Sequence, residues 1–114
     1  MEQCLFCKIS AGSVPAKIVY SDDQVLVIED INPVAPLHLL LIPKKHIVSV
    51  LELQETDDQL VGHLLRVAAQ LARDRGVAAE GFRIVANTNE WGGQSVFHLH
   101  FHLLAGRQLQ WPPG

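Results

Sequence analysis

The feature that most constrains this chain is the stretch Val96–Leu104, where three histidines alternate with large apolar residues. In a β-strand, successive side chains point to opposite faces of the sheet. The stretch therefore predicts a strand with one apolar face toward the core and one histidine face that carries the chemistry. We expect Phe97, Leu99, Phe101 and Leu103 on the apolar face, and Val96, His98, His100 and His102 on the other.

Imidazoles that share one face of a strand lie about 6.6 Å apart. Three positive charges at that spacing would repel, so we expect at least some of these rings to be neutral near pH 7. A neutral imidazole can act as a nucleophile, a base or a metal ligand. An ordinary polar sheet face is the alternative, but it does not explain why half of the six histidines fall on one strand face.

The segment Trp91–Ser95 precedes the histidines and contains paired glycines. Gly92 and Gly93 can turn the chain and expose successive backbone N–H groups, which form a small anion-binding concavity. Gly-Gly is also a common signal for a plain hairpin turn, and taken alone it favours that turn. Because the histidine face follows at once, we favour a phosphate or oxyanion cradle.

The length of 114 residues suits one domain with its own core. We treat residues 1–114 as that domain, with residues 106–114 as a C-terminal tail. The sequence has no bilayer-length apolar run and no signal-peptide pattern, so we expect a cytoplasmic protein with no membrane partner. The net charge of −3 argues against a nucleic-acid partner, because binding the phosphate backbone needs clustered Lys and Arg.

Both cysteines of the chain, Cys4 and Cys7, lie in one C-x-x-C motif. A structural disulfide is disfavoured in a reducing compartment. A redox pair, half of a metal site and two small buried residues remain open as interpretations. Two thiolates do not complete a tetrahedral zinc site, and histidines are the available partners.

Apolar runs bounded by turn residues predict strands at 18–20, 25–28, 38–42 and 81–87, the first two joined as a hairpin. The last of these should pair with the histidine strand as an antiparallel hairpin, which places Asn87 near the histidine face. Asp30 and Asn32 lie at a strand end beside a proline-stiffened loop. Ligand binding and loop capping are equally compatible with these two side chains.

Residues 56–76 predict one long helix, which begins with a capping box of Thr56 and Gln59 and ends before Gly76. Its apolar surface is broader than a single sheet contact requires, and Gly62 would allow close packing. We therefore expect a helix buried on two sides, as at a dimer interface. The narrow polar stripe, on which we expect His63 to be solvated, consists of His63, Arg66, Gln70 and Arg73.

With these motifs together, the sequence resembles the histidine-triad superfamily, whose pattern is His-x-His-x-His followed by two apolar residues. The resemblance covers nearly the whole chain and is strongest to the nucleoside-phosphoramidase branch. It implies an α+β fold, a five-stranded antiparallel sheet with one long helix and a short N-terminal helix, dimerising through the helix and a strand. The further matching motifs are Ile9, Pro15–Ile18, Asp30–Pro33, Ile42–Ile47, Gly92–Ser95 and Trp111–Gly114.

The resemblance implies a hydrolase that cleaves purine nucleoside 5′-phosphoramidates, in which AMP is joined to an amine. His100 matches the histidine that attacks the α-phosphorus and forms a nucleotidyl-histidine, which water then hydrolyses. Ser95 would donate a hydrogen bond to the departing nitrogen, and the Gly93–Ser95 amides would stabilise the equatorial oxygens. His98 and His102 complete the catalytic set and would orient His100 or contact phosphate.

The resemblance also assigns nucleotide contacts. Asp30 would bind the ribose hydroxyls, and Trp111 would cross to the partner subunit and help shape its leaving-group pocket. The expected partners are thus a purine nucleotide conjugate and a second copy of the chain. The base pocket would be lined by Ile9, Ile28 and Ile31, and the phosphate and leaving group would be held by Asn87, Gly93, Gln94 and Ser95 with His100 and His102.

Family members with a C-x-x-C motif can hold zinc with two cysteines and two histidines, and Cys4, Cys7, His46 and His98 match those positions. Other members of the branch lack the cysteines, so the resemblance implies a structural zinc and no cofactor required for catalysis. Cleavage of dinucleoside polyphosphates and a non-enzymatic nucleotide-binding scaffold or sensor remain as alternatives. A metalloenzyme with zinc on all three triad histidines ranks lowest.

Overall fold

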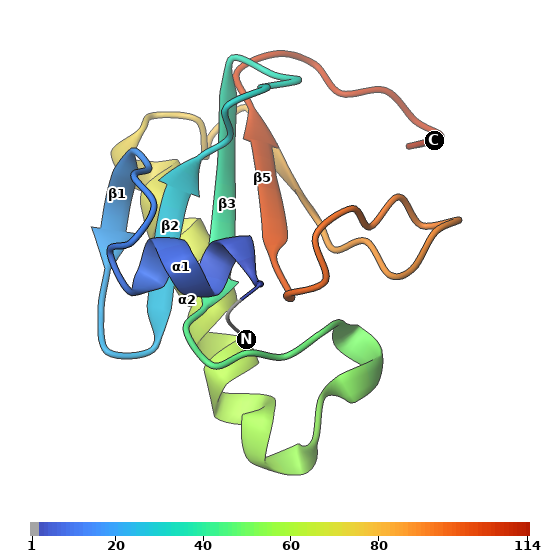
Figure 1. Ribbon diagram of the computed structural model, residues 1–114. Helices are drawn as coiled ribbons and strands as arrows, with labels where there is room; N and C mark the ends of the chain where they lie inside the picture. Colours follow the sequence, from blue (N-terminus) through green and yellow to red (C-terminus); the bar gives the residue numbers. More distant parts are fainter. Residues whose placement is uncertain (1–2) are drawn as a thin grey trace.

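The computed structural model describes residues 3–114 and contains a five-stranded antiparallel sheet with a helix on each face (Figure 1). In space the strands run in the order β1-β2-β3-β5-β4. This is the predicted α+β architecture. Along the chain the elements are α1 (Leu5–Ser10), β1 (Ile18–Ser21), β2 (Val25–Glu29), β3 (Leu37–Pro43), 3-10 turns at Val50–Glu52 and Glu55–Asp57, α2 (Asp58–Asp74), β4 (Phe82–Val85) and β5 (Phe101–Ala105).

The central strands are buried on both faces because α1 crosses one face of the sheet and α2 covers the other (Figure 1). Strands covered in this way read as continuous apolar runs, as β2 and β3 do. The core on the α1 side holds Phe6, Ile9, Leu26, Ile28, Leu40 and Ile42. The core on the α2 side includes Val25, Val27, Leu39, Leu41, Leu64, Ala68, Leu99, Phe101 and Leu103.

The histidine strand is shorter than the sequence predicts, because β5 begins only at Phe101. Its partner β3 ends at Pro43, which has no N–H to donate and whose carbonyl accepts from the side chain of His98. The Leu99 N–H donates instead to the carbonyl of Ile47, in the loop after β3. The predicted alternation of faces holds from His98 onward, but Phe97 is 50% exposed and lies outside the core.

Helix α2 begins at Asp58, two residues later than predicted, and the expected capping box of Thr56 and Gln59 is wrong. The carboxylate of Asp57 accepts the Gln54 N–H at 3.0 Å and pairs with Lys45 at 2.6 Å. This local bonding produces a 3-10 turn ahead of the helix.

Within one chain α2 buries one face against the sheet, and burial of a second side at a dimer interface stays a prediction. The fully buried residues include Leu64 and Ala68, whereas Leu65 is 42% exposed. Nothing lies within 4 Å of a Cβ built on Gly62, so that glycine permits no close packing inside the chain. The sheet covers most of the apolar surface of α2.

His63 is not a free solvated side chain, which corrects our expectation. Its Nε2 lies 2.6 Å from the Asp22 carboxylate, which also accepts the Tyr20 hydroxyl. Although burial opposes the effect, hydrogen bonds from Tyr20 and His63 hold the pKa of Asp22 well below its ordinary value. The group ties α2 to the β1–β2 turn.

Within residues 3–114, no helix is long and apolar enough to cross a membrane.

Candidate active site

The three triad histidines lie where the chain enters β5, on the side of the sheet that α1 covers. Phe6 of α1 makes edge contacts with His98 and His100, at ring-centroid separations of 5.8 and 5.0 Å. The rings of His100 and His102 follow at 5.1 Å. The predicted histidine face therefore exists, although only His102 belongs to a regular strand.

Backbone carbonyls fix which nitrogen carries the proton on two of these rings. The Nε2–H of His98 donates to the Pro43 carbonyl at 2.7 Å, and the Nδ1–H of His100 donates to the His98 carbonyl at 2.7 Å. Because a carbonyl can only accept, the other nitrogen of each neutral ring carries a lone pair. Burial lowers the pKa of His98, which keeps that ring neutral.

The lone pair of His100 on Nε2 has no hydrogen-bond partner among residues 3–114. The residue is only 8% exposed, but every fully buried side-chain nitrogen within residues 3–114 has a hydrogen-bond partner. Because Nε2 of His100 has no such partner, it must reach solvent. The geometry presents one oriented imidazole nitrogen to solvent, as nucleophilic attack requires.

A hydrogen-bond chain formed by Asp30, His38 and His102 lies on the other side of His100. The Val34 N–H donates to Nδ1 of His38 at 3.1 Å, so the proton of neutral His38 is on Nε2. That Nε2–H donates to Nδ1 of His102 at 2.9 Å, and a carboxylate oxygen of Asp30 lies 3.4 Å from the same Nε2. His102 is thereby left with its proton on Nε2.

Both histidines of the hydrogen-bond chain are held neutral. Burial, followed by the neighbouring His100 and His38, lowers the pKa of His102 to about 4. Burial also lowers the pKa of His38, although Asp30 opposes the shift. At neutral pH the chain therefore ends in a neutral N–H donor next to His100, which can donate to a phosphate oxygen.

Asp30, His38 and His102 have ligand atoms within 4.8 Å of one another, the spacing of a metal site. A metal on Nε2 of His38 would force the proton onto Nδ1, where it would face the Val34 N–H. The backbone therefore favours a chain of hydrogen bonds over a metal at this position.

The thiol–imidazole cluster consists of Cys4, Cys7, His46 and His98, whose ligand atoms also lie within 4.8 Å of one another. Nδ1 of His98 is 3.2 Å from Sγ of Cys4, and Nδ1 of His46 is 3.4 Å from Sγ of Cys7. The two Nδ1 atoms are 3.2 Å apart. A tetrahedral zinc ion separates such ligand atoms by about 3.3–3.8 Å, given its usual bond lengths.

The chemistry of the donors also fits zinc. His98 offers a lone pair on Nδ1 because its Nε2–H is held by Pro43, the arrangement that metal-bound histidines use. Burial, followed by the hydrogen bond with Cys4 and the charge of Cys4, raises the pKa of the Cys7 thiol. A cation between the two sulfurs would favour their thiolate forms. Four protein ligands leave no open position, which is typical of a structural site.

The glycine loop, Asn87–Ser95, leaves fewer free backbone amides than the sequence suggests. The Gly93 N–H donates to the Glu90 carbonyl and the Gln94 N–H to the Asn89 carbonyl, so the turn itself uses two of the three expected amides. Ser95, which is exposed, retains an N–H without a partner in the described residues 3–114. Of the three amides, the Ser95 N–H is therefore the one that stays free of a turn hydrogen bond, and the contacts of Gly93 and Gln94 with phosphate stay a prediction.

The side chain of Gln94 fixes the shape of this loop. It is 6% exposed, accepts the Asn89 N–H at 2.9 Å, and donates to the carbonyls of Val48 and Val96 at 2.8 and 3.2 Å. A Cβ on Gly92 would lie 2.4 Å from the Thr88 carbonyl oxygen, so only glycine fits there. The loop is thus a rigid support that presents Ser95.

Comparison with known proteins agrees with this site. The family described as "Scavenger mRNA decapping enzyme C-term binding" matches residues 3–110. An uncharacterized HIT-like protein of Synechococcus elongatus is 48% identical over 99% of this chain and 98% of its own length. The chain belongs to the histidine-triad (HIT) family.

Two solved HIT structures bear on the site. A HIT family hydrolase from Legionella pneumophila Philadelphia 1 superposes with a TM-score of 0.97 at 48% identity, covering 98% of this chain and 100% of its own. A Zn-bound histidine triad family protein from Mycobacterium smegmatis superposes with a TM-score of 0.78 at 31% identity, covering 93% of this chain and 76% of its own. Metal binding thus occurs in a HIT protein of the same fold.

The residues that the HIT resemblance assigns to a nucleotide are only partly gathered. Ile9 of α1 and Ile28 of β2 belong to the core on the α1 side and are 6% and 5% exposed, whereas Ile31 is 90% exposed and outside that cluster. The side chain of Asn87, the first residue of the glycine loop, folds over the loop, with its Nδ2 3.8 Å from where a Cβ of Gly93 would be. Trp111 is 80% exposed in the tail.

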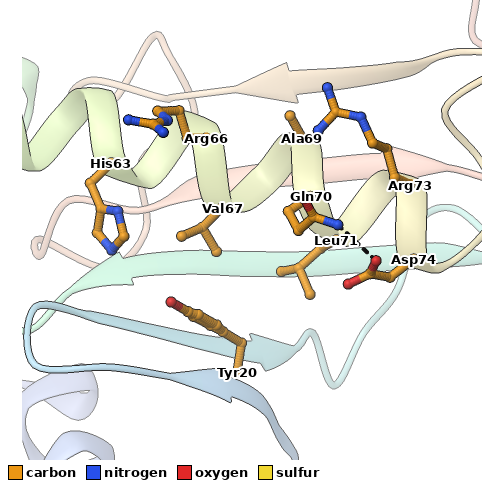
Figure 2. Close-up of a pocket in the computed structure, with 9 residues that line it drawn as sticks. All are labelled: Tyr20, His63, Arg66, Val67, Ala69, Gln70, Leu71, Arg73 and Asp74. Atoms are coloured by element: carbon orange, nitrogen blue, oxygen red, sulfur yellow. Dashed lines mark hydrogen bonds between the residues drawn. The ribbon is translucent and has the colours of Figure 1, made fainter.

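A groove of about 580 Å³ lies between α2 and β1 (Figure 2). Val67 and Leu71 point toward the strands, where Tyr20 forms the opposite wall, while Arg66 and Arg73 project away from them (Figure 2). The lining includes no residue of the triad, the thiol–imidazole cluster or the glycine loop. We therefore place the chemistry of this HIT protein at the histidines.

Sequence reasoning missed His38 and the Pro43 carbonyl. The spacing of His38, Leu40 and Ile42 in a predicted strand places all three on one face, which the structure turns toward α1 and the HIT triad. That alternation was a usable signal for His38. No side-chain pattern could have indicated that the Pro43 carbonyl would bind His98, because the partner is backbone.

Proposed function

We propose that this HIT protein hydrolyses purine nucleoside 5′-phosphoramidates through a covalent nucleotidyl-histidine at His100. One observation carries the proposal: the His98 carbonyl holds the Nδ1–H of His100 and leaves Nε2 as an oriented, solvent-reaching lone pair. Covalent catalysis divides one difficult displacement into two easier ones.

In the first step Nε2 of His100 attacks the α-phosphorus, the bond from phosphorus to the amine nitrogen breaks, and that nitrogen takes up a proton and leaves as the free amine. Ser95 donates a hydrogen bond to that departing nitrogen, and the Nε2–H of His102 donates to a phosphoryl oxygen. In the second step water attacks the phosphorus and gives up a proton, the bond to Nε2 breaks, and AMP leaves. The His98 carbonyl stabilises the His100 ring while it carries the phosphoryl group.

Asp30 binds the ribose hydroxyls in this proposal, and Ile31 contacts the base. Asp30 follows β2, and one of its carboxylate oxygens accepts the Asn32 N–H at 2.8 Å, which fixes the loop that carries both residues. Ile9 and Ile28 form the floor beneath the base, and Asn87 lies on the leaving-group side.

Cys4, Cys7, His46 and His98 would hold a structural zinc ion. When bound, the ion supplies a cross-link between the N-terminal segment, the loop after β3 and the histidine segment, and no chemical step passes through it. The observed ligand separations of 3.2–3.6 Å support this assignment.

We further propose a homodimer in which the tail of one subunit contributes to the site of its partner. β4 is a sheet edge, and Arg83 on that strand donates to the Gln110 carbonyl at 2.8 Å with its guanidinium 6.0 Å from the Trp111 ring centre. The indole is thereby held at an open edge with most of its surface uncovered.

The decisive experiment compares kcat/KM on AMP-amine and diadenosine polyphosphate substrates. We expect the amine conjugate to be preferred and an AMP adduct to appear on the His100 peptide in mass spectra of samples quenched in alkaline denaturant. A preference for diadenosine substrates would favour the dinucleoside polyphosphate hydrolase. Nucleotide binding without an adduct or turnover would favour a scaffold or sensor.

A further inference from the structure

The thiol–imidazole cluster is open to solvent. Cys4, Cys7 and His46 are each only half-buried, while His98 is 1% exposed. A depression of about 420 Å³ reaches the cluster and is lined by Gln3, Cys4, Leu5, His46, Ser95, Val96 and Phe97. Small reagents in water can therefore reach the cluster at Cys4 and His46, in contrast to a sealed structural site.

The cluster is joined to His100 by a single residue. Nδ1 of His98 faces the thiols at 3.2 and 3.6 Å, and the carbonyl of the same residue accepts the Nδ1–H of His100 at 2.7 Å. On the other side of the ring, the Nε2–H donates to the Pro43 carbonyl at 2.7 Å, and Phe6 makes an edge contact with the ring. Any event that frees the ring on its Nδ1 side thus removes one of the two polar anchors of the residue whose carbonyl orients His100.

The two thiols are also arranged for disulfide formation. Cys4 is the N-cap residue of α1, and its sulfur accepts the Cys7 N–H at 3.4 Å, so both cysteines lie on one helical turn. Their sulfurs lie within 4.8 Å of each other. C-x-x-C pairs at such positions form reversible disulfides in redox proteins.

We propose that the Cys4–Cys7 pair is a redox switch that controls the orientation of His100 through His98. This inference rests on the proposed function and on the metal site described above. A peroxide oxidises the pair: one thiolate attacks an oxygen, the O–O bond breaks, and a sulfenic acid and water form. The second thiolate then attacks the sulfenic sulfur, a second water leaves, and two protons are taken up.

Oxidation withdraws both sulfur ligands, and two histidines do not retain zinc. His98 then keeps its hydrogen bond to Pro43 and its contact with Phe6 but loses its anchor on the Nδ1 side, and the segment that carries the His98 carbonyl loosens. The pair of electrons returns when a dithiol reduces the disulfide, which restores both ligands. The expected result is a hydrolase that is active when reduced and inactive when oxidised.

The test begins with reduced, zinc-loaded protein treated with hydrogen peroxide. Three quantities are followed: zinc release with a metallochromic dye, the Cys4–Cys7 disulfide by mass spectrometry, and amide hydrogen exchange of residues 96–100. We expect one zinc released per disulfide, exchange of this segment at least about tenfold faster, and a rate of His100 adduct formation at least about tenfold lower. Dithiothreitol with zinc should reverse all three changes.

A Cys7→His variant is the matched control, because it keeps four zinc ligands and removes the disulfide partner. Its metal content and adduct rate are compared before and after peroxide, and neither should change. A Cys4→Ser/Cys7→Ser variant controls for oxidation elsewhere, and peroxide should not alter its adduct rate. An equal loss in either variant would overturn the proposal.

Other outcomes separate this proposal from the function on which it rests. Disulfide formation and zinc release with unchanged exchange of residues 96–100 would overturn the switch and leave the hydrolase intact. Reduced protein that holds no zinc would also overturn it. If no substrate is hydrolysed in the reduced form, the proposed function fails, and zinc release with hydrogen exchange still decides the switch.

Discussion

Two groups of histidines flank His100, and their contrast explains how one short motif supports different chemistries. The thiol–imidazole cluster contains two imidazoles and two thiols, and the hydrogen-bond chain contains two imidazoles and one carboxylate. In each group the ligand atoms lie within 4.8 Å of one another. In the cluster, the Pro43 carbonyl accepts a hydrogen bond from the Nε2–H of His98, which leaves the Nδ1 lone pair facing the thiols. In the chain, the Val34 N–H donates to Nδ1 of His38, which leaves the Nε2–H of that ring facing His102.

The difference teaches that distance alone does not identify a metal site. A single backbone contact decides whether an imidazole offers a lone pair or a proton, and therefore whether its neighbours can share a metal or only a hydrogen bond. His100 lies between the two groups and depends on both, through the His98 carbonyl on one side and the His102 ring on the other.

The largest expected effect on turnover comes from substitution of His100, which lies between the two groups. His100→Asn retains a donor for the His98 carbonyl and removes the proposed nucleophile, so we expect kcat to fall by at least about 10⁴-fold. Nucleotide binding, measured by calorimetry with AMP, should change only a few-fold. Turnover within tenfold of the unsubstituted protein would rule out the covalent mechanism.

The next largest effect is on bound zinc, which we expect in the thiol–imidazole cluster and not in the hydrogen-bond chain. Cys4→Ser/Cys7→Ser should reduce bound zinc from one ion per chain to none and lower the free energy of unfolding by about 3–4 kcal/mol at zinc levels far above Kd. His38→Leu should keep its zinc, because the hydrogen-bond chain holds no metal. Elemental analysis and urea unfolding, with and without chelator, measure both. Loss of zinc in His38→Leu would contradict the contrast.

A smaller effect is expected from the hydrogen-bond chain. His38→Leu leaves Nδ1 of His102 without its donor, so we expect kcat to fall about 10- to 100-fold with little change in KM. His38→Gln can still donate to His102 and should recover part of that loss. Steady-state kinetics on an AMP-amine substrate measures both, and equal rates for the two variants would mean that His38 is only a packing residue.

The smallest effect is on the pH dependence of stability. The pKa of His102 is about 4 in the folded chain and ordinarily about 6.5, so the unfolded chain binds more protons between these values. The free energy of unfolding should fall by about 1–2 kcal/mol as pH drops from 6.5 to 4, since the ring is only partly shielded from solvent. The low pKa of His38 acts in the same direction.

Urea unfolding at constant ionic strength checks this slope, and His102→Asn should flatten it. Asp22 provides an internal reference, because its pKa is lowered and its stabilising contribution is lost only as pH falls below its ordinary range. An unchanged slope in His102→Asn would show that His102 is not the group responsible.

Much of the fold could be predicted because strand periodicity and loop signals are local. The alternation in Val96–Leu104 indicated which side chains face the core, and the spacing of apolar runs indicated five strands and one long helix. The errors occurred where backbone groups decide the outcome. Pro43 ends the ladder before Phe101, and the amides of the glycine loop are used by its own turn.

By itself, the sequence determined the side chains of the site and the sheet face that bears them, because periodicity assigns residues to faces and the order of the motifs carries the family resemblance. Only the tertiary structure decided what each ring can do. The thiols of the cluster lie 94 and 91 residues from His98, and Pro43 lies 55 residues from it. A ring's free nitrogen is fixed by such distant partners, and no local pattern encodes them.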